Sequence, residues 1–215
     1  MKKVAVIGLG RFGITVAREL MKMGFDVLAI DQDEQMVNRV VDSVTHALIL
    51  DSTNRDALLN AGLKTFQTAV VGIGENIEAS ILTTLLLKEM GVEKVIARAI
   101  NNYHGIILEK IGADKIVYPE DEIGVKTARA IANPGLIDFM EFGSELSIAD
   151  TTASENMVGK TLSELQLRNK FGINVIAVKR GEKINGAPGP DDTITEGDVL
   201  LVSGAPKNIS QLKNA

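Results

Sequence analysis

The sequence contains no cysteine and only two histidines among its 215 residues. Without cysteine the chain can form no disulfide bond, no thiolate zinc site and no thiol nucleophile. Two histidines are too few for a metal centre built from several imidazoles. These absences exclude disulfide-rich scaffolds, cysteine-dependent enzymes and multi-histidine metal sites.

Long apolar runs and an excess of positive charge are also lacking. No stretch approaches the about 18 apolar residues of a membrane-spanning helix, and the N-terminus has no long hydrophobic region or cleavage site of a signal peptide. The formal net charge is -5 and aromatic residues make up 4% of the chain, which argues against a nucleic-acid platform. We therefore expect a cytoplasmic protein that binds a small ligand or another protein, and no nucleic-acid polymer.

The composition, 45% hydrophobic and 24% charged, is that of an ordinary folded protein. Short β-branched runs alternate with helical segments through the first two thirds of the chain. Expected strands cover 3–7, 26–30, 47–50, 69–72, 95–97 and 115–117, and expected helices cover 12–23, 33–41, 54–61, 76–90 and 103–111, with one more from Pro119. This repetition predicts an α/β fold, a Rossmann-like doubly wound parallel sheet with helices on both faces.

The pattern changes after about residue 142. Expected strands at 144–149, 174–179 and 198–203 are separated by a short helix at 162–165 and a turn-rich segment at 181–193. Strands joined by turns predict a small α+β domain. We therefore expect a nucleotide-binding domain over 1–140 and a second domain over 141–215.

The strongest local motif is a glycine-rich loop that follows the first expected strand and opens the first expected helix. Gly8 permits a tight turn, Gly10 allows backbone to approach a pyrophosphate, and Gly13 allows close helix–strand packing. Asp31, at the end of the second strand, can accept the ribose hydroxyls and disfavours a 2′-phosphate. A tight turn alone would explain the glycines, but the strand, the helix and Asp31 together favour nucleotide binding.

Other candidate residues follow neighbouring strands or open helices. Arg11 offers a guanidinium to phosphate oxygens, or it is a solvated residue of the first helical turn. His104 is a phosphate or ribose ligand or a surface residue, and Glu120 is part of a cation site or simply stabilised by the helix dipole. The full cofactor-binding set that we predict is Gly8, Gly10, Arg11, Phe12, Gly13, Asp31, Gln32, Asp51, Ser52, Gly72, Ile73, Gly74, Arg98, His104 and Glu120, with Glu120 also the metal ligand.

No catalytic group accompanies this binding site. Neither Tyr103 nor Tyr118 has a lysine four residues later, no GxSxG motif occurs, and the expected second domain contains no histidine. The residues therefore favour a binding protein over an enzyme. An NAD(H)-binding redox sensor and, less readily, a small NAD-dependent dehydrogenase remain as alternatives.

The ordered set of motifs VIGLGRFG, THA at 45–47, GENIEAS, TTLLLKEMG, LEKIGADKIVYPE and EGDVLLVSG resembles the RCK/KTN family. Within it, the chain is similar to the cytoplasmic regulatory subunits of Ktr/Trk-type potassium uptake systems. The resemblance implies RCK N- and C-domains, dimers assembled into an octameric ring, and a separate membrane-embedded potassium-translocating subunit. It also implies that the exchange of ATP for ADP switches the conformation of the ring, and that some relatives bind NAD or NADH instead.

The resemblance also implies roles for individual residues. Arg11 matches an arginine that contacts the ATP γ-phosphate across a dimer, Asp31 the ribose ligand, and His104 a further nucleotide contact. Glu120 matches a carboxylate that holds a divalent cation or sodium near the phosphates. A cyclic di-AMP site of the C-domain is matched by Leu167, Arg168, Asn174, Val175 and Pro190, although Gln166 and Asn169 replace an aspartate and an alanine that are common there.

Overall fold

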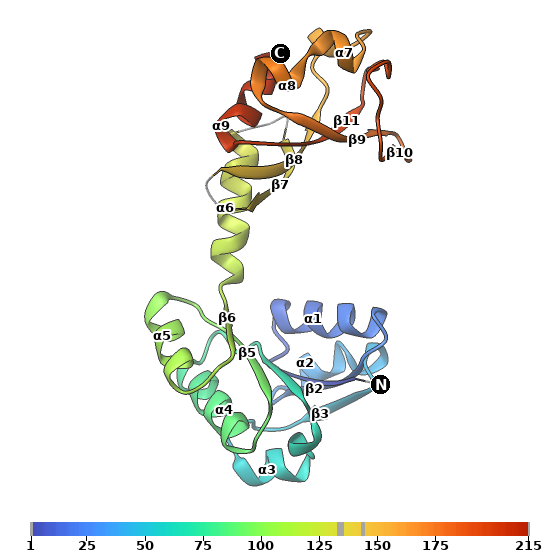
Figure 1. The fold of residues 1–215 in the computed structure, drawn as a ribbon. Helices are drawn as coiled ribbons and strands as arrows, with labels where there is room; N and C mark the ends of the chain where they lie inside the picture. The colour runs from blue at the N-terminus through green and yellow to red at the C-terminus, as the bar shows by residue number, and fades with distance from the viewer. Residues whose placement is uncertain (1, 133–135, 143–144, 215) are drawn as a thin grey trace. The chain divides into compact units, whose positions relative to one another are not determined.

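A computed structural model describes residues 2–132, 136–142 and 145–214 of the chain. The chain forms two compact units, Met1–Glu122 and Ile123–Ala215, which we call the N-terminal unit and the C-terminal unit (Figure 1). The boundary expected from the sequence, between residues 140 and 141, falls within strand β7 (Leu136–Phe142) and stays a prediction.

The N-terminal unit is built on a six-stranded sheet with the order β3-β2-β1-β4-β5-β6. All of its strand pairs are parallel, so the predicted doubly wound sheet is confirmed. The strands are β1 (Lys3–Ile7), β2 (Asp26–Asp31), β3 (His46–Ile49), β4 (Thr68–Val71), β5 (Lys94–Arg98) and β6 (Lys115–Val117). The helices are α1 (Arg11–Lys22), α2 (Glu34–Asn38), α3 (Arg55–Asn60), α4 (Ile77–Glu89), α5 (Asn102–Lys110) and the first turn of α6 (Pro119–Ala132).

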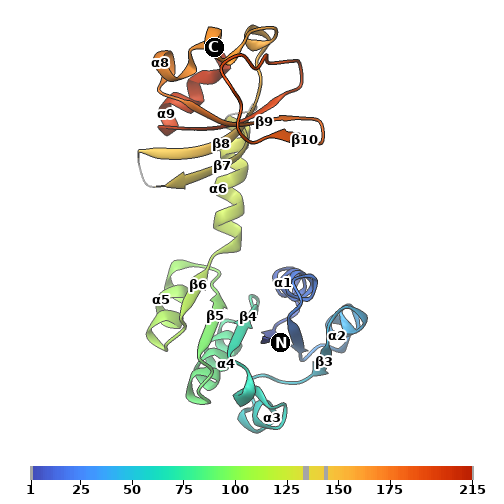
Figure 2. The same cartoon turned by 45° about the vertical axis from the view of Figure 1, so that its right-hand side comes forward.

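Both faces of this sheet are buried, because successive strand residues point to opposite sides. Along β1, Val4 and Val6 pack into a cluster with Ala17 of α1 and Val37 of α2. Ala5 and Ile7 belong to the opposite cluster, which also holds Leu58 of α3, Leu86 and Leu87 of α4 and Leu108 of α5. Figure 2 shows these two layers of helices on either side of the strands. The continuous apolar runs of the sequence are therefore explained by burial on two faces.

Helix α2 is shorter than the sequence predicts. The expected helix runs to residue 41, whereas α2 ends at Asn38 and a separate 3₁₀ turn covers Val41–Ser43. Val40 leaves the helical region with φ -124° and is fully buried in the core cluster on that face of the sheet. Tertiary burial of Val40 thus overrides the local preference for a longer helix.

The C-terminal unit contains a five-stranded sheet of order β10-β9-β11-β8-β7, with antiparallel strand pairs. The predicted small α+β fold is thus confirmed, although the sequence predicted no strand at β7, and β10 (Lys183–Asn185) falls within the segment that it predicted to be rich in turns. The other elements are β8 (Leu146–Thr152), α7 (Leu162–Leu165), α8 (Leu167–Phe171), β9 (Asn174–Arg180), β11 (Val199–Gly204) and α9 (Pro206–Ile209), with 3₁₀ turns at Glu155–Met157 and Ser210–Asn214.

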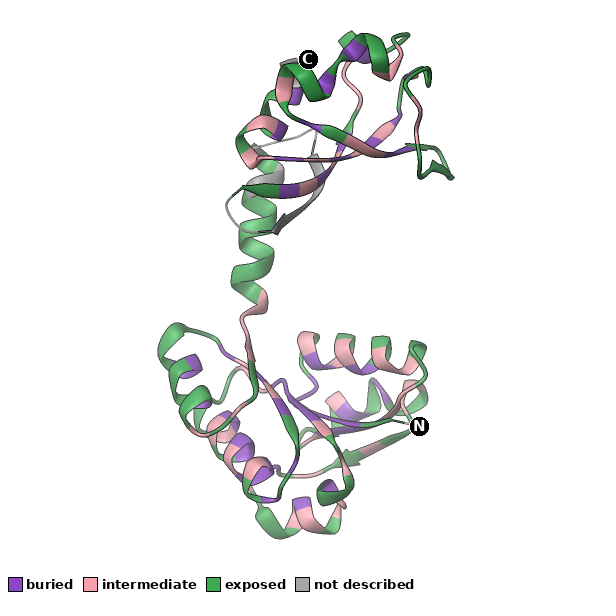
Figure 3. Ribbon diagram, viewed as in Figure 1, coloured by how far each residue is buried: buried purple, intermediate pink, exposed green. Residues whose placement is uncertain are grey.

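The described side chains differ sharply in burial between sheet and connecting helix (Figure 3). Strands β1 and β2 are almost entirely buried, whereas Ile123, Val125 and Ile131 of α6 are exposed by 65%, 50% and 75%. No helix among the described residues combines the length and the apolar character needed to cross a membrane.

Candidate nucleotide site

The loops that follow β1 and β4 meet at the centre of the N-terminal sheet. The strand order reverses there, and such a switch point opens a crevice at the carboxyl ends of the strands. Gly8 has φ +90°, and a Cβ on it would lie 2.7 Å from the Ile73 backbone nitrogen. A Cβ on Gly72 would lie 2.9 Å from the Gly8 carbonyl oxygen. Only glycine at these positions allows the two backbones to approach so closely.

The remaining glycines of the motif have opposite surroundings. A Cβ on Gly13 would overlap the carbonyl oxygen of Gly8, whereas a Cβ on Gly10 would meet nothing within 4 Å. Gly13 therefore serves the packing of α1 against β1, while Gly10 faces open space through which a ligand can reach the backbone. The assignment of separate roles to these glycines agrees with this geometry.

The amino end of α1 is open to an anion. Its N-cap is Gly10, which provides no side-chain hydrogen bond, and no acidic residue stands in the first turn. The first helical hydrogen bond runs from Ile14 N to Gly10 O at 3.0 Å, so the preceding amides point out of the helix end without helical acceptors. These amides and the helix dipole together favour phosphate binding.

Asp31 holds the glycine loop in place. Its Oδ2 accepts a hydrogen bond from Leu9 N at 2.6 Å, and its Oδ1 accepts one from Asp33 N at 3.0 Å. Leu9 itself is fully buried, so the bond fixes the middle of the loop to the end of β2. Each carboxylate oxygen can accept further bonds, and Asp31 can thus position the loop and bind ribose hydroxyls at the same time.

The loop after β3 is held by local hydrogen bonds. Asp51 Oδ1 accepts from Thr53 N at 2.9 Å and from Thr53 Oγ1 at 2.7 Å, and these bonds lower the pKa of Asp51 below its ordinary value. Ser52 is buried and shares a 2.7 Å hydrogen bond with Thr83 Oγ1 of α4. Asp51 is thus exposed at the sheet edge, while Ser52 joins the loop to α4.

Arg98 and Glu120 form an ion pair beside this crevice. Arg98 Nη2 donates to Glu120 Oε1 at 2.5 Å, with side-chain exposures of 19% and 62%. The guanidinium lies against Gly74, where any Cβ would overlap it. Arg98 Nε is buried and has no hydrogen-bond partner among the described residues. Arg98, at the end of β5, therefore connects the loop after β4 with the first turn of α6.

His104 is buried, in contrast to the surface residue that the sequence also allowed. It is 1% exposed, its backbone N donates to Asn101 Oδ1 at 2.9 Å, and its Nδ1 accepts from Ile100 N at 3.4 Å. Burial lowers the pKa of His104 below its ordinary value of 6.5, so the ring is neutral at pH 7 and carries its proton on Nε2. That buried Nε2 has no partner in the part of the chain that the structure describes.

The other predicted residues of the N-terminal unit lie around the same crevice. Arg11 is exposed in the first turn of α1, and no ion pair of its guanidinium occurs among the described residues. Phe12 packs partly against the core and Ile73 against the opposite cluster, and Gln32 is exposed after β2. The predicted residues thus follow the carboxyl ends of strands of one parallel sheet, and their common site stays a prediction.

The residues predicted for a second messenger lie in the C-terminal unit. Arg168 of α8 and Asn174, which begins β9, are exposed, and Val175 is half-buried against the core. Leu167 is only 4% exposed and packs in that core. Pro190 is exposed, and its carbonyl oxygen accepts from Ser163 N at 2.9 Å.

Metal ligands are scarce. No group of three or more His, Asp or Glu side chains that could hold an ion occurs among the described residues. Glu120 alone therefore cannot complete a protein-only cation site, and further oxygen ligands would have to come from water, a nucleotide or a second copy of the chain.

Several features of the site have no signal in the sequence. The Leu9–Asp31 hydrogen bond and the Arg98–Glu120 pair join residues that are 22 positions apart in each case. The buried hydroxyls of Ser80 and Thr84, which have no hydrogen-bond partner among the described residues, could be noticed in the sequence only as polar residues in an otherwise apolar helix.

Family profiles match both units. The profile of the TrkA-N domain covers residues 4–119, and that of the TrkA-C domain covers residues 147–215. The chain is 42% identical over 212 residues to "Ktr system potassium uptake protein C" of Bacillus subtilis (strain 168), covering 99% of this chain and 96% of that protein. It is 36% identical to "Ktr system potassium uptake protein A" of Vibrio alginolyticus, covering 94% and 92% of the two chains.

Solved structures share the fold. The structure entitled "GsuK Channel" superposes with a TM-score of 0.68 at 16% identity, covering 99% of this chain and 39% of the channel. "GsuK channel bound to NAD" gives a TM-score of 0.65 at 17% identity, covering 99% of this chain and 39% of that channel. At these identities the likeness extends to the fold alone.

Proposed function

The chain belongs to the family of potassium uptake proteins with TrkA-N and TrkA-C domains, and from this premise we propose that it is the nucleotide-binding regulatory subunit of a potassium uptake system. In this role it gates a separate potassium-translocating membrane subunit and performs no chemical reaction. A nucleotide bound to the N-terminal unit changes the conformation of the assembly that controls transport.

One observation carries the nucleotide-binding part of the proposal. The open amides at the start of α1 lie beside a loop whose glycines leave space at Gly10 and whose position is fixed by Asp31. The buried, unpartnered Nε2 of His104 supplies a donor that a ligand oxygen can satisfy. We expect the phosphate, ribose and base of an adenine nucleotide to contact these groups in turn along the carboxyl edge of the sheet.

ATP and ADP are the ligands that we propose for switching. Contacts to adenosine are common to both nucleotides and cannot shift a conformational equilibrium between them, since only differential binding does so. Arg11, exposed at the phosphate end of the site and without an ion pair in the described chain, is suited to contact the γ-phosphate of a nucleotide in the same subunit or a neighbouring one.

The cation that we propose near the phosphates has to compete with Arg98. Glu120 Oε1 already accepts a 2.5 Å hydrogen bond from Arg98 Nη2. A divalent cation or a sodium ion that binds Glu120 must therefore displace the guanidinium of Arg98. Phosphate oxygens that draw Arg98 away would free the carboxylate. Nucleotide and cation would then support each other's binding.

The exposed apolar residues of α4 and α5 support a homo-oligomer. These helices pack against each other, and contiguous exposed apolar surface on a soluble domain marks an interaction site. The residues concerned are Ile77 and Leu82 of α4, Tyr103, Ile106 and Ile107 of α5, and Ile100 just before α5, exposed by 37%, 37%, 82%, 49%, 42% and 42%. We propose dimers that assemble into an octameric ring, located in the cytoplasm and attached to the membrane through the transporter partner.

Cyclic di-AMP is the second ligand that we propose, in the C-terminal unit. Exposed Arg168 and Asn174 offer donors for a phosphate and a base, and the exposed ring of Pro190 offers an apolar contact. Leu167 packs in the core and would support this surface without touching the ligand. Arg168→Gln should weaken cyclic di-AMP binding in calorimetry, with Lys207→Gln as the control. Equal binding by both variants would contradict the assignment.

Calorimetric titration of the full chain with ATP, ADP, NAD and NADH, each with and without Mg²⁺ or Na⁺, tests the proposal. We expect tight binding of ATP and ADP, with the cation strengthening ATP alone. Arg11→Ala should weaken ATP more than ADP, whereas Arg18→Ala, later in the same helix, should change neither. Equal losses for both nucleotides in Arg11→Ala would remove the γ-phosphate role, and absence of any nucleotide binding would contradict the proposal as a whole.

An NAD(H)-binding redox sensor is the second candidate. The observation in its favour is Asp31 at the end of β2, since an acidic residue there suits the ribose of NAD as well as that of ATP. Preference for NADH over both ATP and ADP in the same titrations would select this candidate and leave Arg11 without its proposed role.

A further inference from the structure

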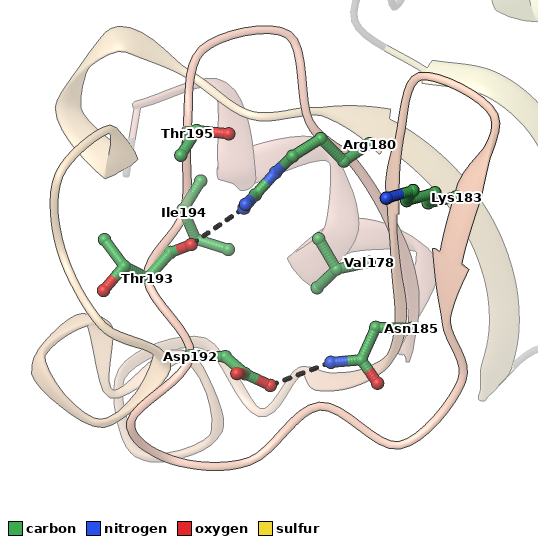
Figure 4. Close-up of a pocket in the computed structure, with 8 residues that line it drawn as sticks. All are labelled: Val178, Arg180, Lys183, Asn185, Asp192, Thr193, Ile194 and Thr195. Atoms are coloured by element: carbon green, nitrogen blue, oxygen red, sulfur yellow. Dashed lines mark hydrogen bonds between the residues drawn. The ribbon is translucent and has the colours of Figure 1, made fainter.

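The C-terminal unit contains a pocket that lies outside all of the predicted sites. It has a volume of about 360 Å³, within the roughly 300–1,000 Å³ typical of small-molecule sites. Figure 4 shows its lining side chains. They are Val178, Arg180, Lys183, Asn185, Asp192, Thr193, Ile194 and Thr195.

One wall of the pocket is a single face of the β9–β10 hairpin. Lys183 pairs with Arg180 and Asn185 pairs with Val178 across the two strands. Residues two apart on a strand share a face, so all four side chains point to the same side. The segment from Asp192 to Thr195 covers this face, and the buried side chains of Val178 and Ile194, exposed by 7% and 0%, form an apolar floor.

Arg180 is held rigidly at one end of the pocket. Its Nε and Nη2 donate to the two carboxylate oxygens of Asp198, each at 2.8 Å, and Nη2 also donates to Thr193 O at 3.0 Å. Asp198 is fully buried. These bonds occupy Nε and both hydrogens of Nη2, and they leave the hydrogens of Nη1 for another acceptor.

Lys183 adds a second positive charge directly opposite Arg180. Like charges at paired positions of an antiparallel sheet destabilise it. Asp198 offsets the charge of Arg180, whereas Lys183 forms no hydrogen bond or ion pair in the part of the chain that the structure describes. An anion bound between Arg180 Nη1 and Lys183 Nζ would remove this repulsion and satisfy both groups.

The opposite end of the pocket provides acceptors. Asp192 Oδ2 accepts from Asn185 Nδ2 at 2.9 Å and from Gly189 N at 2.8 Å. These bonds fix the carboxylate and leave Oδ1 available. A hydroxyl or amino group of a ligand would donate here.

From this division of charge we propose that the pocket binds a small organic anion that carries hydroxyl or amino groups. Its carboxylate or phosphate lies between Arg180 and Lys183, and its donor group faces Asp192. The site is independent of nucleotide binding by the N-terminal unit, so either function can fail without the other. A ligand here joins the β9–β10 hairpin to the segment before β11.

Titration of the full chain, followed by amide chemical shifts, with glycerol 3-phosphate and glycerate tests the proposal and separates phosphate from carboxylate as the anion. We expect shifts at residues 178–195 with one or both anions and none with glycerol. Lys183→Gln should weaken binding about tenfold, equivalent to about 1.4 kcal/mol. Lys179→Gln, the same change on the other face of the same hairpin, should leave binding unchanged.

Two further outcomes are decisive. Asp192→Asn should weaken glycerol 3-phosphate relative to inorganic phosphate, because only the former carries alcohol hydroxyls that can donate to Asp192. The proposal is wrong if neither anion shifts the pocket resonances at about 10 mM, a concentration that would detect even millimolar affinity. Equal losses in Lys183→Gln and Lys179→Gln would show general charge attraction and would also overturn it. Arg180 is left intact throughout, because Asp198 depends on it for folding.

Discussion

Two arginines that end β-strands show how differently the two units use charge. Arg180 of β9 binds a carboxylate that is 0% exposed, through Nε and Nη2. Arg98 of β5 binds a carboxylate that is 62% exposed, through Nη2 alone, and its buried Nε has no partner among the described residues. The first pair satisfies its buried carboxylate and leaves only Nη1 of an exposed guanidinium for another acceptor, whereas the second leaves a buried guanidinium nitrogen without a partner.

The same contrast extends to the surroundings of the two pairs. Asp198 also accepts from Thr195 N at 2.8 Å and from Thr195 Oγ1 at 3.0 Å. Together with the bonds from Arg180, each carboxylate oxygen of Asp198 therefore accepts two hydrogen bonds. At the edge of the N-terminal sheet, Arg11 and His104 Nε2 are without partners in the described chain. The satisfied groups around Asp198 therefore stabilise the fold, whereas the unsatisfied groups at the edge of the N-terminal sheet are available to a ligand.

The largest effect should come from breaking the satisfied pair. Asp198→Ala removes the acceptor of Arg180 and of the Thr195 amide, and we expect a loss of about 3 kcal/mol in the free energy of unfolding of the C-terminal unit. Hydrogen exchange measured by mass spectrometry should show faster exchange in 146–204 and unchanged exchange in 3–117. The exposed Asp191→Ala serves as the control, and equal protection in both variants would contradict the structural role of Asp198.

The next effect separates two glycines of one loop. Gly13→Ala places a methyl group against the Gly8 carbonyl, and we expect about 2 kcal/mol of destabilisation, as for other overpacked sites. Gly10→Ala meets nothing within 4 Å, so thermal unfolding should change little while ATP and ADP binding is lost. If Gly10→Ala kept full nucleotide affinity, the space above this residue would not be the phosphate site.

We expect the two units to lose stability at different pH values as the solution is made more acidic. Burial lowers the pKa of His104 in the folded chain below 6.5, so on acidification the unfolded chain binds a proton at this ring at higher pH than the folded chain does. The N-terminal unit therefore loses stability as the pH falls below 6.5. The pKa of Asp198 is lowered from 3.8 to about 2, first of all by its hydrogen bond from Arg180. Its contribution, about 2 kcal/mol, is therefore present above pH 4 and lost as the pH falls towards 2.

Both tyrosines of the chain, Tyr103 and Tyr118, lie in the N-terminal unit, so the tyrosine band of the near-ultraviolet circular dichroism follows that unit alone. We expect the tyrosine signal to change at higher pH than the hydrogen-exchange protection of the C-terminal unit. In His104→Gln the loss of N-terminal stability between pH 6.5 and pH 4 should become smaller. A reversed order of the two transitions would contradict the assignment of these groups.

The smallest effect on stability should come from the exposed pair. Arg98→Gln breaks the contact with Glu120, and we expect a change below about 1 kcal/mol because the carboxylate is solvated. Removing the competing guanidinium should strengthen Mg²⁺ binding at Glu120, measured by calorimetry in the presence of ATP. Arg55→Gln, which breaks the exposed pair with Glu89, is the control. Weaker Mg²⁺ binding in Arg98→Gln would show that Arg98 supports the cation.

The sequence could predict the N-terminal fold because its signals are local. Each buried strand is a continuous apolar run, and Gly8, Gly10, Gly13 and Asp31 are placed by one turn and one strand end. The same approach missed β7 and β10, since a strand of three residues such as Lys183–Asn185 owes its existence to the partner strand. Pairing with β9 is a tertiary effect that no local pattern records.

The candidate site was only partly predictable for a related reason. Which residues follow a strand can be found in the sequence, but which of them are buried or paired cannot. His104 could be either a ligand or a surface residue by sequence, and only the packing of α5 shows that it is buried. The partners of Arg98 and Arg180 lie 22 and 18 positions away, and no spacing rule connects them.

The double role of Asp31 constrains how this site can evolve. The carboxylate that would bind the ribose is also the acceptor of the Leu9 amide at 2.6 Å. Replacing it to admit a phosphorylated ribose would therefore loosen the glycine loop at the same step. A lineage that changed its nucleotide would first need a substitution elsewhere that holds residue 9 in place. We therefore expect the preference for an unmodified ribose to change slowly in evolution, even where selection favours the change.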